Sequence, residues 1–111
     1  MQSALVINAL AALAQEHRLA LFRLLVQAGS PGMPAGAIAG ALGVPNSSLS
    51  FHLAQLTAAG LISQQRQGRS LIYSADYRAM NDLLGYLTEN CCGAAGCAAA
   101  ACDPEPQRKS A

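Results

Sequence analysis

The chain has 111 residues, 52% of them hydrophobic, and a formal net charge of +1. A chain of this length forms about one domain, and a domain this small commonly gains stability by oligomerising. No stretch approaches the roughly 18 uninterrupted apolar residues of a membrane span, which argues against a membrane protein. We therefore expect one domain that forms a dimer.

The charges are divided unevenly along the chain. Residues 76–111 carry a balance of −2, whereas residues 1–75 carry a balance of +3, from Arg18, Arg23, Arg66 and Arg69 against Glu16. A locally basic segment in a nearly neutral chain favours a negatively charged partner such as nucleic acid.

Two helices are predicted in the first 28 residues. The first runs from Ser3, its expected N-cap, to about Ala14, and apolar side chains cover so much of its surface that it should meet a partner. This opening lacks the basic region of a signal peptide and leads directly into a second helix, from about Glu16 to Ala28. We therefore expect a cytoplasmic protein whose cysteines are reduced thiols.

Two more helices, joined by a short turn, are predicted between residues 35 and 59. The first runs from about Ala35 to Leu42, and Gly43 permits the turn after it. The second begins at Asn46, its expected N-cap, and ends near residue 59, because Gly60 favours a left-handed turn. Two short helices connected in this way indicate a helix-turn-helix.

The second of these helices has an apolar face and an uncharged polar face. At roughly 100° per residue, Leu49, Leu53 and Leu56 fall within about 40° of one direction and should pack inward. The opposite face offers hydroxyls, an amide and an aromatic ring, which suit base edges and thymine methyl groups in a DNA groove. An incidental polar face of an ordinary amphipathic helix is the alternative. We predict that the DNA-binding residues of this helix are Ser47, Ser48, Ser50, Phe51, His52 and Gln55.

The two histidines are not expected to bind metal. His17 stands at a helix start, where it should cap the helix or be exposed. His52 lies about 60° from the leucine stripe, so its ring should either be buried at the edge of the core or contact a phosphate.

A β-hairpin is predicted after the second helix of the pair. Segments 62–67 and 70–75 flank Gly68 and Arg69, with alternating side chains that include Leu71 and Tyr73 on one face. Arg66 and Arg69 lie at the tip, where they could hold the DNA backbone or serve only to keep the turn soluble. A hairpin in this position is the wing of a winged helix.

A last amphipathic helix is predicted from Asp76 or Tyr77 to about Asn90. Its apolar positions follow the i, i+3, i+4, i+7 spacing and are Met80, Leu83, Leu84 and Leu87. Residues 1–90 should therefore form a mainly α fold with a small β-hairpin, a winged helix-turn-helix of five helices and a two-stranded wing. We expect a homodimer through the first and last helices.

All four cysteines lie in the C-terminal tail, residues 91–111. Thiolates select soft ions, and Gly93 and Gly96 allow the chain to fold back so that several sulfurs can surround one centre. Three thiolates without histidine suit trivalent arsenic or antimony, whereas structural zinc would take a fourth ligand. A vicinal disulfide or an incidental tail is the alternative. The predicted ligands are Cys91, Cys92 and Cys97, with Cys102 as a further candidate.

The chain resembles the ArsR/SmtB family of winged-helix metalloregulators over roughly residues 5–92. The residues that carry the resemblance are Ser50-Phe51-His52-Leu53, Ala59-Gly60-Leu61 and Gly68-Arg69-Ser70 with Tyr73. The resemblance implies a homodimeric repressor that binds an inverted-repeat operator in double-stranded DNA. It also implies that the repressor leaves the operator on binding its inducer, here As(III), with Sb(III) as an alternative.

The chain also departs from the family pattern. Many arsenic sensors of the family carry a cysteine at the start of the recognition helix, but residues 46–49 contain none. No histidine follows His52, so the zinc sites that other members build on the last helix are missing too. Sensing must therefore use the tail, where we favour Cys97 over Cys102 as the third ligand.

Three other functions remain open from the sequence. A repressor of the same fold could sense thiol oxidation, or could sense methylated arsenicals through Cys91 and Cys92 alone. A metal-storage or metallochaperone module would bind the ion without selecting a DNA sequence. No base lies near a nucleophile in any motif of the chain, so an enzyme is not expected.

Overall fold

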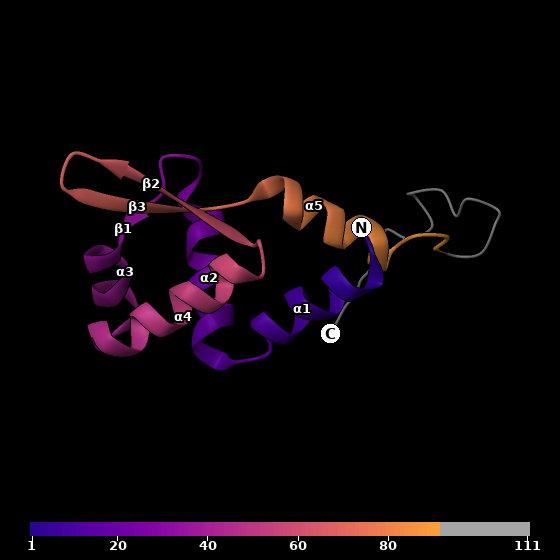
Figure 1. Cartoon of the computed structure of the whole chain (residues 1–111), viewed down its shortest axis with the longest axis horizontal. Helices are drawn as coiled ribbons and strands as arrows, with labels where there is room; N and C mark the ends of the chain where they lie inside the picture. Colours follow the sequence, from indigo (N-terminus) through magenta and orange to yellow (C-terminus); the bar gives the residue numbers. More distant parts are fainter. Residues whose placement is uncertain (92–111) are drawn as a thin grey trace, which may run out of the picture.

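The computed structural model describes residues 1–91, which form a winged helix-turn-helix (Figure 1). Its helices are α1 (Ser3–Leu13), α2 (Glu16–Ala28), α3 (Ala35–Leu42), α4 (Asn46–Ala58) and α5 (Tyr77–Leu87), and its strands are β1 (Met33–Pro34), β2 (Ile62–Gln67) and β3 (Ser70–Ala75). The predicted fold class is confirmed. Within this part of the chain, no helix has the length and apolar character that a membrane crossing would require.

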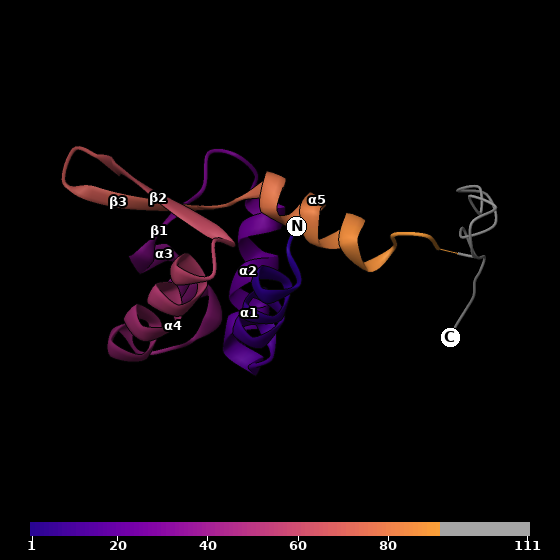
Figure 2. The same ribbon diagram turned by 45° about the vertical axis from the view of Figure 1, so that its right-hand side comes forward.

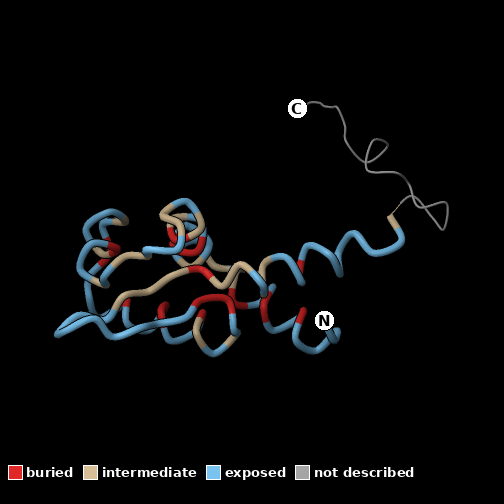
Figure 3. The backbone as a smooth tube through the Cα atoms, turned by 90° about the horizontal axis from the view of Figure 1, so that it is seen from above, coloured by how far each residue is buried: buried red, intermediate tan, exposed pale blue. Residues whose placement is uncertain are grey.

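The centre of the core lies between α2 and α4. Leu21 and Leu25 of α2 are fully buried, as is Leu56 of α4, each with 0% of its surface exposed. Ile38 of α3 and Leu61, which precedes β2, are equally buried. The buried segments gather in the middle of the body, whereas exposed segments run around it (Figure 3). The apolar periodicity of the helices thus converges on a single core.

The sheet has three strands, one more than the two-stranded wing that the sequence predicts. The middle strand, β3, pairs antiparallel with β2, from Ile62 opposite Ala75 to Gln67 opposite Ser70, and with β1 on its other side. The two residues of β1 are too few to show an alternating pattern, and Pro34 lacks the N–H that a strand uses. The extra strand ties the connection between α2 and α3 to the wing.

Two predicted N-caps are wrong by one residue. Ser3 and Asn46 are the first helical residues of α1 and α4, and the cap positions belong to Gln2 and Pro45, neither with a side-chain cap hydrogen bond. At α4 the proline ring fixes φ at −62°, and its carbonyl oxygen accepts a hydrogen bond from the Leu49 N–H at 2.9 Å. The restricted backbone of Pro45 therefore sets the start of α4 without a capping side chain.

The last helix is anchored at its start and extends away from the body at its end (Figure 2). The Asp76 carboxylate accepts a hydrogen bond from a backbone N–H of the first turn at 3.0 Å, and the Tyr77 hydroxyl donates to the Val26 carbonyl at 2.9 Å. The helix ends at Leu87, earlier than the predicted end near Asn90. Asn90 has a left-handed φ of 58° and lies outside the helix.

Helices α1 and α5 contact each other and carry most of the large apolar side chains that the structure exposes. These side chains are Leu5, Ile7 and Leu10 on α1 and Leu84, Tyr86 and Leu87 on α5. Ile7 has 64% of its surface exposed. A concentration of apolar groups on two adjoining helices is typical of an interaction surface.

The turn before β1 provides a test of the fold. Gly32 has φ of 72°, and a Cβ there would collide with the Tyr73 carbonyl oxygen of β3, whereas Gly43 has φ of 68° and open space around it. Both Gly→Ala variants should lose about 1–2 kcal/mol of unfolding free energy from the left-handed backbone. Gly32→Ala should lose about 1–3 kcal/mol more, because β1 must move off β3. Urea denaturation of both variants measures this difference, and equal losses would contradict the close approach of β1 to β3.

Candidate nucleic-acid interface

The outer face of α4 is presented by a helix whose inner face is firmly packed. Leu49, Leu53 and Leu56 are buried, as predicted, with 1%, 4% and 0% of their surfaces exposed. The helix stops where Gly60 takes a left-handed φ of 77° and the Leu61 N–H donates back to the Leu56 carbonyl oxygen at 3.1 Å. With both ends and the inner face fixed, the outer face has a defined orientation.

Five of the six predicted DNA-binding residues of α4 are exposed: Ser47, Ser48, Ser50, Phe51 and Gln55. Phe51 has 57% of its surface exposed, an unusual position for a large aromatic ring without a partner surface. Ser50 differs from the others because it lines a hollow of about 390 Å³ between α4 and the sheet, together with Gln64 and Tyr73. The outer face thus offers hydroxyl, amide and aromatic groups that can read base edges.

The ring of His52 is buried, which is one of the two positions that the sequence predicts; the other is a contact with a DNA phosphate. Its side chain is 8% exposed, and its Nδ1 lies 3.4 Å from a guanidinium nitrogen of Arg18 at the start of α2. The ring centroids of His17 and His52 are 5.6 Å apart. His52 therefore supports α4 from behind, and its buried ring meets the exposed Phe51 ring edge-on, with 5.7 Å between the centroids.

Arg18 is a central residue that the sequence analysis missed. Its Nε donates to the Ala12 carbonyl oxygen near the end of α1 at 2.6 Å, and its guanidinium also reaches His52 on α4. The pairing joins residues 34 positions apart, so no local pattern indicates it. Arg18 therefore connects three helices that meet behind the candidate interface.

The environment of His52 favours its neutral form. Burial is the largest cause and lowers the pKa of His52 below 6.5, and the positive charge of Arg18 lowers it further, with a smaller contribution from His17. Since a neutral ring can accept a hydrogen bond from the guanidinium, the lowered pKa and the contact with Arg18 are consistent with each other.

The wing presents its two arginines at the tip, as predicted. Every residue from 63 to 70 is exposed, and Gly68 turns the chain with φ of 63° between Gln67 and Ser70. Arg66 and Arg69 stand on either side of this turn, where they add positive charge without contributing to the core. Such positions suit contacts to a phosphate backbone.

The predicted thiol site falls almost entirely outside the described residues. Cys91 is half-buried, and its N–H donates to the Thr88 carbonyl oxygen at 2.9 Å just after α5. Cys92, Cys97 and Cys102 lie beyond residue 91, so the arrangement of the four thiols remains a prediction. Within residues 1–91, no three His, Cys, Asp or Glu side chains are grouped closely enough to hold a metal ion.

Comparison with protein families places a helix-turn-helix domain at residues 13–65, which spans α2, β1, α3, α4 and the start of β2. Among characterised proteins, the chain is similar to the HTH-type transcriptional regulator YgaV of Escherichia coli. The two are 34% identical over 79 residues, which cover 71% of this chain and 80% of YgaV.

Solved structures show the same relationship. An ArsR-like transcriptional regulator from Rhodococcus superimposes with a TM-score of 0.67 and 27% identity, covering 77% of each chain. A homodimeric winged helix-turn-helix DNA-binding domain from Mycobacterium bovis gives a TM-score of 0.62 and 28% identity, covering 78% of this chain and 81% of that one.

The lowered pKa of His52 predicts a pH dependence of stability. Between the unfolded pKa near 6.5 and the lower folded pKa, the unfolded chain binds more protons, so the unfolding free energy should fall as the pH falls through this window. His52→Gln should remove this contribution. His17→Gln should keep most of it, because burial of His52 is unchanged. Urea titrations of the three proteins from pH 7.5 to 5 test this, and parallel pH profiles for the parent and His52→Gln would refute it.

Proposed function

This chain belongs to the ArsR-like winged helix-turn-helix transcriptional regulators, and from that premise we propose that it is a repressor that binds operator DNA as a dimer and releases it on binding trivalent arsenic. The observation that carries the DNA-binding part is the exposed, uncharged outer face of α4 on a helix whose inner face is buried. A recognition helix needs this combination, because base edges are read at fixed distances.

In this proposal, α4 enters the major groove. Ser47, Ser48, Phe51 and Gln55 read bases, and Arg66 and Arg69 of the wing hold the phosphate backbone. The positive charge comes from few residues, so the affinity should fall only modestly with added salt. Ser50, between α4 and the sheet, has a lesser part, and His52 acts only by supporting the helix.

The dimer forms through the exposed apolar side chains of α1 and α5. These helices adjoin each other at the end of the molecule away from the wing, so one interface can cover both (Figure 1). The homodimeric relative from Mycobacterium bovis supports a dimer, and the exposed apolar side chains of α1 and α5 support its placement at these helices. A two-fold dimer would present two copies of α4 to the two half-sites of an inverted repeat.

The arsenic part of the proposal rests on the cysteines of the tail. Four thiols lie within residues 91–102, directly after the helix that we assign to the dimer interface. Thiolates are the ligands that soft ions prefer, and the tail contains no histidine that would favour another metal. Binding at Cys91, Cys92 and Cys97 next to α5 can then change how the two subunits pack.

A gel-shift assay tests the proposal with DNA selected by the protein from a random library. Arsenite should release this DNA from the parent protein. Cys91→Ser or Cys92→Ser should raise the arsenite concentration required by about tenfold or more, because losing a ligand weakens binding at least as much as losing a group that supports one. Cys102→Ser is the matched control and should respond almost normally. If arsenite releases no DNA, or if the Cys91 and Cys92 variants respond like the parent, arsenic is not the inducer.

The same assay separates the two nearest alternatives. An oxidation sensor would release DNA with peroxide and recover it with a thiol reductant. A sensor of methylated arsenicals needs two thiolates, so the Cys97→Ser variant would respond to methylarsenite like the parent, whereas a three-thiolate arsenite sensor would lose its arsenite response in this variant. Arsenite binding without any selected DNA sequence would indicate a storage or chaperone module instead.

A further inference from the structure

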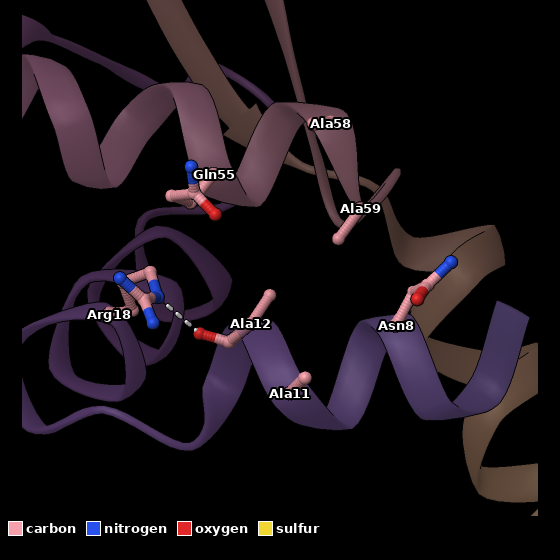
Figure 4. Close-up of a pocket in the computed structure, with 7 residues that line it drawn as sticks. All are labelled: Asn8, Ala11, Ala12, Arg18, Gln55, Ala58 and Ala59. Atoms are coloured by element: carbon pink, nitrogen blue, oxygen red, sulfur yellow. Dashed lines mark hydrogen bonds between the residues drawn. The ribbon is translucent and has the colours of Figure 1, made fainter.

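A recess of about 460 Å³ lies between α1 and the C-terminal half of α4, on the side away from the sheet (Figure 4). Arg18 and Gln55 stand at one end of it and Asn8 at the other. The remaining lining residues are alanines, namely Ala11, Ala12, Ala58 and Ala59. The recess therefore has a cationic end, an amide at the far end and methyl groups between them.

Arg18 supplies the charge in a fixed position. Its Nε is held by the Ala12 carbonyl oxygen at 2.6 Å and one terminal nitrogen lies 3.4 Å from His52, which leaves other N–H groups of the guanidinium for a ligand. No carboxylate within residues 1–91 forms an ion pair with Arg18. A half-buried guanidinium that meets no carboxylate in the described part of the chain is well suited to a planar anion, above all a carboxylate.

The rest of the lining indicates what the anion should be attached to. The side-chain amide of Gln55 can donate a second hydrogen bond to an anion at the Arg18 end. The alanine methyl groups suit a small apolar body, and the Asn8 amide can meet a polar group at the far end. The volume lies within the range of small-molecule sites, roughly 300–1,000 Å³.

A DNA phosphate is a poorer match for this recess. The recess opens beside Gln55, Ala58 and Ala59, toward the end of α4, whereas Ser47 and Ser48 are at the start of that helix. A phosphodiester linked to sugars on both sides would have to reach between two helices to meet the guanidinium. The methyl groups would also have nothing apolar to contact.

We propose that this recess binds a small organic carboxylate, with the carboxylate group on Arg18 and Gln55 and the apolar body against the alanine methyl groups. Binding of the carboxylate does not depend on the proposed function, because the residues that hold it are defined by the recess alone.

Calorimetric titration of the full-length protein with benzoate, in the absence of DNA, tests this binding. Titration with sodium chloride at the same ionic strength is the control. A ligand of this size should bind with a dissociation constant of about 1 mM. Benzamide has the same shape without the charge and should bind at least about tenfold more weakly. Equal binding of benzamide, or no binding of benzoate, would overturn the proposal.

Three variants locate the site. Arg18→Gln should weaken benzoate at least about tenfold, and the exposed Arg23→Gln on the same helix should leave it unchanged. Since Arg18→Gln can also disturb the fold, Ala59→Leu fills the recess from the end of α4, where the Ala59 methyl points toward α1, and leaves Arg18 in place (Figure 4). It should abolish benzoate binding, and unchanged binding would contradict the assignment.

Titration with inorganic phosphate tests whether the recess selects an organic carboxylate or a phosphate such as that of the DNA backbone. Phosphate should bind more weakly than benzoate, because it has no apolar body. If phosphate binds more tightly than benzoate, the recess recognises the anion alone and the carboxylate site is refuted. Because no DNA is present, these results do not depend on whether the protein is an arsenic-responsive repressor.

Discussion

The packing of α4 against α2 is the constraint on which the rest of the structure depends. Leu49, Leu53 and Leu56 are removed from water on one face of α4, and Leu21 and Leu25 are buried on α2. Each of the five would cost about 2–5 kcal/mol if cut back to alanine, a large share of the stability of a small domain. Because the inner face is fixed this firmly, the outer face can present polar side chains at defined positions.

Arg18 and His52 extend this constraint to the first helix. Arg18 is bonded to the end of α1 and contacts α4 through His52, so the helix we assign to the dimer interface is physically connected to the helix we assign to DNA. The recess between α1 and α4 opens at the same place. A ligand in the recess and a change in the packing of α1 would therefore act on the same group of contacts.

The fold could be predicted from the sequence where the pattern is local and repeated. Leucines at helical spacing place the inner face of α4, and glycines near its end and in the wing mark turns that the structure confirms. The two-residue β1 could not be predicted, because its pairing with β3 depends on the close approach of Gly32 to Tyr73, which no local pattern encodes.

The candidate site also has one part that local sequence patterns predict and another part that depends on tertiary contacts. The exposed residues of α4 and the wing arginines could be predicted, since they need only the phase of a helix and the position of a turn. The role of Arg18 could not, because it depends on tertiary contacts to Ala12 and His52. The ligands of the tail depend on how residues beyond 91 fold back, which spacing alone does not determine.

The most direct test of the central claim, that the outer face of α4 reads DNA, is selection from a random duplex library with the parent protein and with Gln55→Ala. We predict that the parent selects an inverted repeat bound by two chains, and that Gln55→Ala selects a sequence relaxed at the same position of both half-sites while retaining the others. An identical selected sequence for both proteins, or no sequence preference for the parent, would contradict this account.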